Sequence, residues 1–181
     1  EFVMNHTKND LADMNKSIHR TFNMIDLNYF VVSLKNIYKN YGGIEDIISN
    51  KNYGLNIQER ISTFKKIFFS INHPQRSKKH LPSPIDGSSA KRFNMYLRWM
   101  VRSNERGVDF GIWKKINKSD LSIPLDVHTG RIARELGLLS RNQNDSKSVQ
   151  ELDLKLREMD PEDPVKYDYA LFGLGVYENI F

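Results

Sequence analysis

Apolar side chains recur at three- and four-residue intervals along most of the chain, which is the spacing of one face of an α-helix. Residues 26–43 are predicted to form a helix that Asp26 caps and that Gly42 and Gly43 end. Further helices are predicted over residues 57–71 and 149–159, and a last one from Pro164 onward. The apolar positions of the first three stripes are Phe30, Leu34, Ile37, Tyr41, Ile57, Ile61, Phe64, Phe68, Ile71, Val149, Leu152, Leu156 and Met159.

The same pattern predicts the fold class. The sequence shows no pair of alternating segments joined by a hairpin turn and no internal repeat. We therefore predict an all-α, multi-helix fold over residues 1–181, a single domain arranged as two helical lobes with a cleft between them. The long irregular stretch 72–87 interrupts the helices, and we interpret it as a basic loop between the lobes.

The charge is unevenly distributed along the chain, which has a net charge of +5. Residues 60–118 contain 14 Lys and Arg against 3 Asp and Glu, a local net charge of +11. Such a concentration is typical of a surface that binds nucleic-acid phosphates, although a lysine-rich surface can also serve solubility alone. The loop 72–87 contributes Arg76, Lys78, Lys79 and His80 to this basic region.

Composition narrows the function classes. The chain has no cysteine, which excludes disulfides, cysteine-ligated zinc and iron–sulfur clusters. No apolar run approaches the length needed to cross a membrane. His128 has no second ligand at metal-binding spacing on its helix face, so we expect no metal site there.

The stretch "PSPIDGSSAKRFNMYLRWMVR", residues 82–102, opens a helix with a lysine. Ser88 or Ser89 is placed to cap this helix, and Gly87 lets a phosphate approach the backbone closely. Lys91 lies in the first turn, where the positive end of the helix dipole and the neighbouring Arg92 favour the neutral, nucleophilic amine. An ordinary surface lysine is the alternative.

A helical wheel divides this helix into two faces. Its apolar face is expected to pack into the core and to leave Lys91 at the head of an exposed basic stripe. The apolar face carries Ala90, Phe93, Tyr96, Leu97 and Met100, and the stripe carries Lys91, Asn94, Met95, Arg98 and Arg102.

A second stretch, "IPLDVHTGRIARELGLL" over residues 123–139, is built in the same way. Asp126 is placed to cap the helix that follows, and capping alone is the commoner role for such an aspartate. His128 and Arg131 would then lie on the surface of that helix.

Together the two stretches resemble the helix-hairpin-helix DNA glycosylase superfamily, in which a lysine opens one helix after a glycine and an aspartate opens the next in "LDVH". This resemblance covers mainly residues 82–139. The whole chain also resembles an uncharacterised bacterial family, a domain of unknown function, through "KRFNMYLRWMVR", "GVDFGIWKKI", "IPLDVHTGRIARELGLL" and "DPEDPVKYDYALFGLGV".

The glycosylase resemblance implies specific roles. Lys91 matches the nucleophile that attacks the sugar C1′ and displaces a damaged base, and Asp126 matches the carboxylate that assists it. A lysine nucleophile also implies strand cleavage through a Schiff base. The base pocket candidates are Trp99, Phe110 and Trp113. The expected DNA contacts are Gly87, Ser88, Ser89, Arg76, Lys78, Lys79, His80, Arg92, Arg98, Arg102, His128 and Arg131.

The sequence also departs from that superfamily. The hairpin is Gly87-Ser88-Ser89-Ala90 instead of glycine, hydrophobe, glycine, and 35 residues separate Lys91 from Asp126. Both features are similar to the archaeal branch of 8-oxoguanine glycosylases. The chain starts at "EFVMNH", inside the pattern of the uncharacterised family, so we expect helices of the full-length protein to precede it.

The expectation is therefore a bifunctional DNA glycosylase/AP lyase that removes an oxidised purine, such as 8-oxoguanine, from damaged duplex DNA. We expect a bacterial cytoplasmic monomer that needs no cofactor and no membrane. Two alternatives stay open: a helical module that binds nucleic acid without catalysis, and a structural or interaction protein whose basic surface contacts an acidic partner. The distance between Lys91 and Asp126 separates catalysis from the other two.

Overall fold

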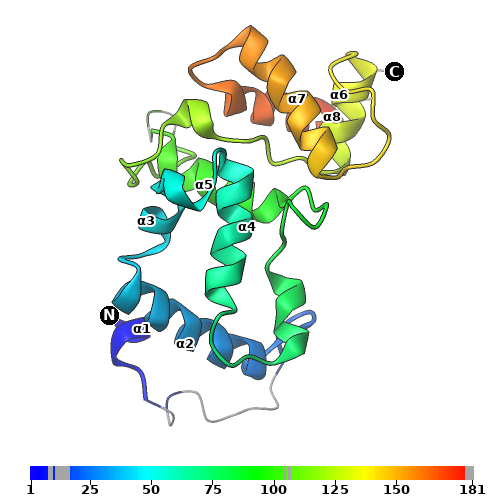
Figure 1. Ribbon diagram of the computed structural model, residues 1–181. Helices are drawn as coiled ribbons and strands as arrows, with labels where there is room; N and C mark the ends of the chain where they lie inside the picture. Colours follow the sequence, from blue (N-terminus) through cyan, green and yellow to red (C-terminus); the bar gives the residue numbers. More distant parts are fainter. Residues whose placement is uncertain (8–9, 11–16, 104, 106, 178–181) are drawn as a thin grey trace.

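The computed structural model describes residues 1–7, 10, 17–103, 105 and 107–177, and it confirms a mostly helical fold (Figure 1). The elements follow one another as α1 (Phe2–Asn5), β1 (Ser17–His19), β2 (Phe22–Asn23), α2 (Met24–Asn40), α3 (Ile44–Ser49), η2 (Lys51–Tyr53), α4 (Ile57–Phe68), η3 (Gln75–His80), α5 (Lys91–Val101), η4 (Lys118–Asp120), α6 (Val127–Glu135), α7 (Ser146–Met159), η5 (Pro164–Tyr167) and α8 (Asp168–Tyr177).

The buried apolar side chains form two clusters. The first cluster joins helices α2 to α5, and the second joins α6, α7 and α8. In Figure 1, α6 to α8 lie together at the top, α1 and α2 lie at the bottom, and α4 runs between these levels. The chain passes from the first cluster to the second between Leu121 and Ile123.

The position of the loop 72–87 differs from the interpretation above. It connects α4 to α5, and both helices bury their apolar faces in the first cluster. The passage between clusters is the extended segment around Ser122 instead, which the sequence analysis did not single out as a boundary.

Helix α2 begins earlier than its apolar stripe predicts. Asn23 caps it by accepting from the Asp26 amide (3.2 Å), and the Asp26 side chain accepts from the Asn23 amide (3.1 Å). Asp26 is therefore the third residue of a capping box and not the cap itself. On the buried face, the Tyr29 hydroxyl donates to the Phe68 carbonyl (2.5 Å) and ties α2 to α4.

A short antiparallel hairpin precedes α2, which the absence of an alternating pattern did not predict. Strands β1 and β2 pair Ser17 with Asn23 and His19 with Phe22, with an irregular register. The strands contain only three and two residues, too few for a period of two to be visible. Arg20, in the turn, has a left-handed backbone with φ of 51°.

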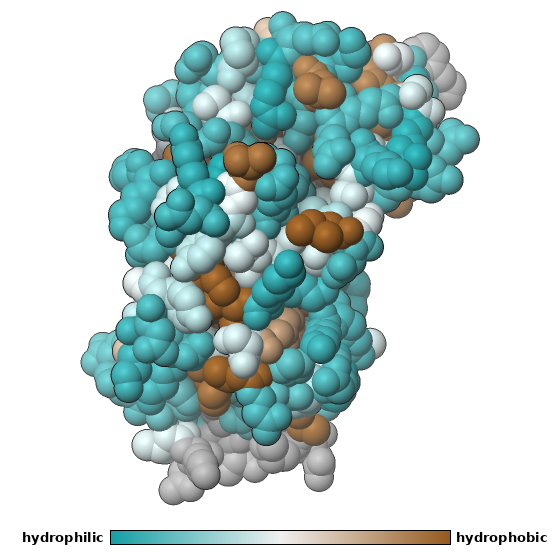
Figure 2. Space-filling view, viewed as in Figure 1, coloured by the Kyte–Doolittle hydropathy of each residue, from teal (hydrophilic) through white to brown (hydrophobic). Residues whose placement is uncertain are grey.

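The molecular surface is mainly hydrophilic on the face shown in Figure 2, where hydrophobic side chains appear as separate patches. Within the described ranges, no helix combines the length and the apolar character that a membrane crossing requires.

Candidate active site

Lys91 and Asp126 meet in the folded chain. The Lys91 amine nitrogen Nζ lies 3.5 Å from Oδ2 of Asp126, although 35 residues separate them in sequence. Lys91 is the first residue of α5 in the first cluster, and Asp126 caps α6 in the second. The side chains are 36% and 19% exposed, so the pair is partly shielded but open to a ligand.

Asp126 has the capping role that the sequence predicts, and it faces Lys91 as well. Its Oδ1 accepts from the amide of Thr129 (2.9 Å), while Oδ2 faces Lys91. The cap fixes the carboxylate rotamer, because one oxygen is committed to the first turn of α6.

Lys91 is positioned by the turn before α5. Ala90, not Ser88 or Ser89, is the capping residue of this helix, and no side chain caps it. The Ala90 backbone is left-handed (φ of 47°), an uncommon conformation for a residue other than glycine, and its side chain is buried. The Gly87 carbonyl accepts from the amide of Ser146 (3.1 Å), which fastens this turn to the start of α7.

The pair lies in a small pocket between α5, the segment before α6, and α8. Its volume is about 130 Å³, below the range of about 300–1,000 Å³ typical of whole small-molecule ligands. The walls are mainly apolar and aromatic. They are formed by Lys91, Met95, Arg98, Trp99, Pro124, Asp126, Asp168, Tyr169 and Phe172. The pocket is therefore too small for a whole ligand of typical size.

A second carboxylate, Asp168, lies at the inner end of this pocket and was not predicted. Arg98 donates through Nη1 to Asp168 and through Nε to Asp109 (3.2 Å). The Arg98 guanidinium carbon also lies 4.1 Å from the ring centroid of Tyr169. Arg98 therefore holds two pocket residues of α8 in place. The available signal was that Asp168, like Asp126, stands at the start of a helix.

Electrostatics distinguish the two carboxylates of the pocket. Burial raises the pKa of Asp168 to about 6, against the opposing effect of Arg98, and the nearby charge of Asp126 acts in the same direction as burial. Near neutral pH the pocket therefore contains a lysine, a buried arginine and two carboxylates, of which Asp168 changes its charge in the mildly acidic range.

The exposed basic stripe predicted along α5 is wrong. Asn94 and Arg98 are 1% and 2% exposed, because Asn94 accepts from Gln58 of α4 (2.9 Å) and Arg98 pairs with Asp109 and Asp168. Arg102 is bound by Asp163 (2.9 Å from Nη2) and by Asp109 (2.7 Å from Nη1). Arg98 and Arg102 are internal ion-pair partners and are not available to DNA phosphates.

The other predicted DNA contacts fall into two groups. Residues held by contacts within the protein include His80 and Arg76, which pair with Asp26, and His128 and Arg131, which contact the carbonyl of Gly175 on α8. Exposed residues are Gly87, Lys78, Lys79 and Arg92, while Ser88 and Ser89 are half-buried beside Lys91. Arg76 and His128 are exposed in spite of these contacts, and no residue of either group lines the pocket itself.

One of the three predicted base-pocket residues lines the pocket. Trp99 is in its wall. Trp113 packs edge-on against Tyr96 (5.4 Å between ring centroids), and Phe110 is exposed in the loop after α5. Their places are taken by Tyr169 and Phe172 of α8, which the sequence analysis did not single out.

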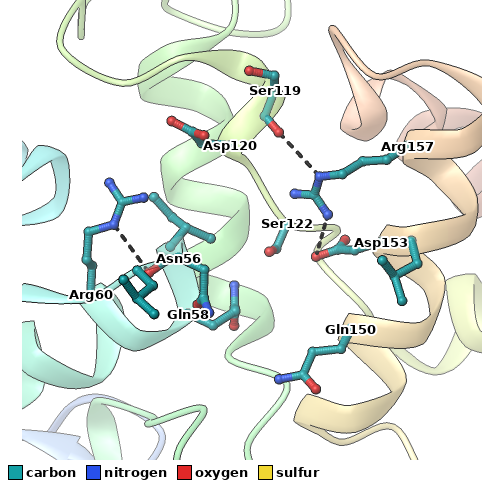
Figure 3. A pocket seen from close by; sticks show the side chains of 12 residues that line it. Asn56, Gln58, Arg60, Ser119, Asp120, Ser122, Gln150, Asp153 and Arg157 are labelled. Atoms are coloured by element: carbon teal, nitrogen blue, oxygen red, sulfur yellow. Dashed lines mark hydrogen bonds and ion pairs between the residues drawn. The ribbon is translucent and has the colours of Figure 1, made fainter. Parts of the chain in front are cut away.

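A larger polar pocket lies between α4 and α7 (Figure 3). Its principal cation, Arg157, donates to the carbonyls of Ser119 (3.4 Å) and Leu121 (2.7 Å) and lies 3.6 Å from Asp153. These contacts join α7 to the end of the first cluster, so the charges in this pocket hold the two lobes together. Over the described residues, no group of three or more histidine and carboxylate side chains is arranged to hold a metal ion.

Comparison with known proteins gives one match. The family model described as "Protein of unknown function (DUF2400)" matches residues 1–177, nearly the whole chain. No curated protein and no solved structure matches the chain.

Proposed function

The chain belongs to the family described as Protein of unknown function (DUF2400), and from its site we propose that it is a DNA glycosylase with AP lyase activity that removes an oxidised purine such as 8-oxoguanine. The observation that carries the proposal is the 3.5 Å separation between the Lys91 amine and the Asp126 carboxylate inside an aromatic pocket. The resemblance of the two surrounding motifs to the helix-hairpin-helix glycosylases supports the same assignment.

The proposed reaction uses the three protons of the Lys91 ammonium group. One passes to Asp126, which leaves a neutral amine that attacks C1′ of the deoxyribose. The C1′–N bond breaks, its electron pair leaves with the base, and the base takes up that proton. A second proton passes to O4′ as the sugar ring opens, and the third stays on the resulting iminium between Nζ and C1′. Elimination then transfers a C2′ proton to the Asp126 carboxylate, which is ionised again at this stage, and breaks the C3′–O bond, whose electron pair leaves with the 3′ phosphate.

The remaining pocket residues support substrate binding and charge stabilisation. A base flipped out of the duplex would enter between the aromatic side chains Trp99, Tyr169 and Phe172. The ionised carboxylates of Asp126 and Asp168 would face the positive charge that develops on the sugar. The exposed cations near the pocket, such as Arg92, would hold the phosphate backbone.

Borohydride trapping tests this proposal. The protein is incubated with labelled duplexes that contain 8-oxoguanine or an abasic site, and covalent adducts are resolved on a denaturing gel. The wild-type protein is expected to form an adduct with both duplexes and Lys91→Gln with neither. Lys147→Gln is the matched control, because Lys147 also lies exposed in the first turn of a helix, α7, but outside the pocket.

Two results would contradict the proposal. An absence of adduct over a panel of oxidised purines and abasic DNA would exclude the lyase chemistry. If the protein nevertheless bound DNA with a strong salt dependence, it would be a binding module without catalysis.

A further inference from the structure

A second pocket, here called the cationic pocket, lies beside the active site. It is formed by the β1–β2 hairpin, the face of α2 beneath it, η3 and the first turn of α5. Its volume is about 430 Å³, within the range of about 300–1,000 Å³ of small-molecule sites. Arg92, which lines it, directly follows Lys91, so the first turn of α5 contributes a residue to each of the two pockets.

Three exposed cations line the cationic pocket: Arg20, Lys79 and Arg92. Among the residues that the structure places, none of the three has a carboxylate within 4.0 Å, and no acidic side chain lines the pocket. This distinguishes them from Arg98 and Arg102, whose charges are neutralised inside the protein. Three unpaired cations around one concave surface attract an anion with several negative oxygens, such as a phosphate.

Aromatic rings also line the pocket. The Phe22 ring packs edge-on against Phe30 (5.2 Å between centroids) and against His80 (5.0 Å). These three rings line the same space as the cations. A flat apolar surface beside phosphate-binding cations is the combination that binds nucleotides by stacking and by charge.

The buried Asp26 supports this aromatic lining. It accepts from the Ser77 hydroxyl (2.7 Å) and pairs with His80 (3.1 Å) and Arg76 (3.3 Å). Burial acts to raise the pKa of Asp26, but these partners together with the Asn23 amide hold that pKa below its usual range. Arg76 also donates to the carbonyl of Thr21 (3.2 Å), which fastens the hairpin over η3. The pocket is therefore preformed on a rigid support.

We infer that the cationic pocket binds one nucleotide of a nucleic-acid strand, with its phosphate on Arg20, Lys79 and Arg92 and its base against Phe22. Because Arg92 follows Lys91, this nucleotide would be a neighbour of the one whose sugar reaches Lys91. This inference rests on the proposed function in one respect, which is that the bound strand is taken to be DNA. The left-handed backbone of Arg20 fits this role, since the turn places an arginine side chain over the pocket where glycine or asparagine would be unstrained.

The test measures the affinity of labelled single-stranded oligodeoxyadenylate by fluorescence anisotropy over a series of salt concentrations. Arg20→Gln, Lys79→Gln and Arg92→Gln are each expected to weaken binding at low salt. Each is also expected to reduce the slope of log affinity against log salt by roughly 0.7, the value for one phosphate contact in a single strand. Lys39→Gln is the matched control, because Lys39 is exposed on α2 and does not line the pocket.

A second variant tests the base contact. Phe22→Leu is expected to weaken binding of the oligodeoxyadenylate by about five-fold or more and to leave binding of an abasic strand of the same length unchanged. Circular dichroism confirms that each variant is folded. The inference would be overturned if Phe22→Leu lost equal affinity for both strands, or if Lys39→Gln lost as much affinity as the pocket variants. Either result would indicate non-specific binding of the negatively charged strand. Binding of free dAMP as tight as that of the strand would assign the pocket to a mononucleotide and overturn the strand assignment.

These outcomes are separable from those of the proposed function. If no covalent adduct forms but the pocket variants still lose strand binding, the glycosylase proposal fails and the cationic pocket stands. If the adduct forms and the pocket variants bind like the wild type, only the cationic pocket fails.

Discussion

At the residue scale, one side chain, Asp126, has both a structural role and a part in the proposed chemistry. Oδ1 accepts from the Thr129 amide and starts α6, whereas Oδ2 faces the Lys91 amine. Capping and catalysis are therefore not alternatives for this residue, because a carboxylate has two oxygens and the cap uses one of them.

Two substitutions separate these roles. Asp126→Asn keeps an oxygen for the cap, so it is expected to change the free energy of unfolding by less than about 1 kcal/mol and to slow borohydride-trapped adduct formation by about 100-fold or more. Asp126→Ala also loses the cap and is expected to cost about 1 kcal/mol more. Urea denaturation and trapping rates measure both effects. If Asp126→Asn formed the adduct at the wild-type rate, the role of Asp126 would be limited to capping α6.

The residues that sequence reasoning found and missed differ in a physical way. Lys91 and Asp126 stand at helix starts next to proline- or glycine-containing turns, and such local signals are visible in sequence. The burial of Arg98 depends on Asp109, in the loop that follows α5, and on Asp168, which lies 70 residues further along the chain than Arg98. A helical wheel takes account only of the residues of the helix itself, so it placed Arg98 in an exposed stripe.

At the element scale, periodicity and capping signals predicted α2 and α4 to α8 with errors at the ends, whereas the short helices α1 and α3 were not predicted. Helix α2 starts at a capping box that precedes its apolar stripe, and the α5 cap is a left-handed alanine for which the sequence carries no signal. The β1–β2 hairpin was missed because it is stabilised by Arg76 from η3 rather than by its own side-chain pattern.

Helix α8 offers a matched pair of glycines for testing its contact with α6. A side chain at Gly173 would meet nothing within 4 Å, so Gly173→Ala is expected to stabilise the protein by about 0.5–1 kcal/mol through helix propensity. A Cβ at Gly175 would lie 3.0 Å from the His128 carbonyl oxygen, so Gly175→Ala is expected to destabilise by about 1–3 kcal/mol.

Thermal or urea unfolding of the two variants measures whether each substitution raises or lowers the free energy of unfolding. Because α8 supplies Asp168 and Tyr169 to the pocket, Gly175→Ala is also expected to slow adduct formation, and Gly173→Ala is not. Shifts of the same sign in both glycine variants would show that α8 does not pack against α6 as described.

At the scale of the whole molecule, two apolar clusters are joined by polar contacts, and both the candidate active site and the pocket in Figure 3 lie at that junction. Asp153 of α7 accepts from the Ile123 amide (2.8 Å), next to the point where the chain passes between clusters. Two helical lobes were predicted from chain length and from the loop 72–87, whereas the two apolar clusters of the structure meet near Ser122, where packing between distant segments sets the boundary.

The pH dependence of stability tests this junction. Burial raises the pKa of Asp153 to about 6, above its unfolded value of 3.8, in spite of Ser122, Ile123 and Arg157. The folded state therefore holds a proton that the unfolded state has lost, and this contribution is full below about pH 4 and disappears as pH rises through about 6.

Asp153→Asn stays neutral at every pH and is expected to remove this decline, which amounts to up to about 3 kcal/mol. Glu158→Gln, an exposed change on the same helix, is the control and is expected to leave the slope unchanged. Urea denaturation at several pH values measures the slopes. An identical decline in wild-type protein and Asp153→Asn would contradict the assigned pKa.

The central claim is that the Lys91 amine is the nucleophile, and the most direct measurement is the site of the covalent bond. Exposed lysines can also form imines with abasic sugars, so the trapped adduct should be digested with a protease and mapped by tandem mass spectrometry. The account predicts the reduced sugar linkage on Lys91 alone. A linkage on other lysines such as Lys79, with Lys91 unmodified, would contradict it.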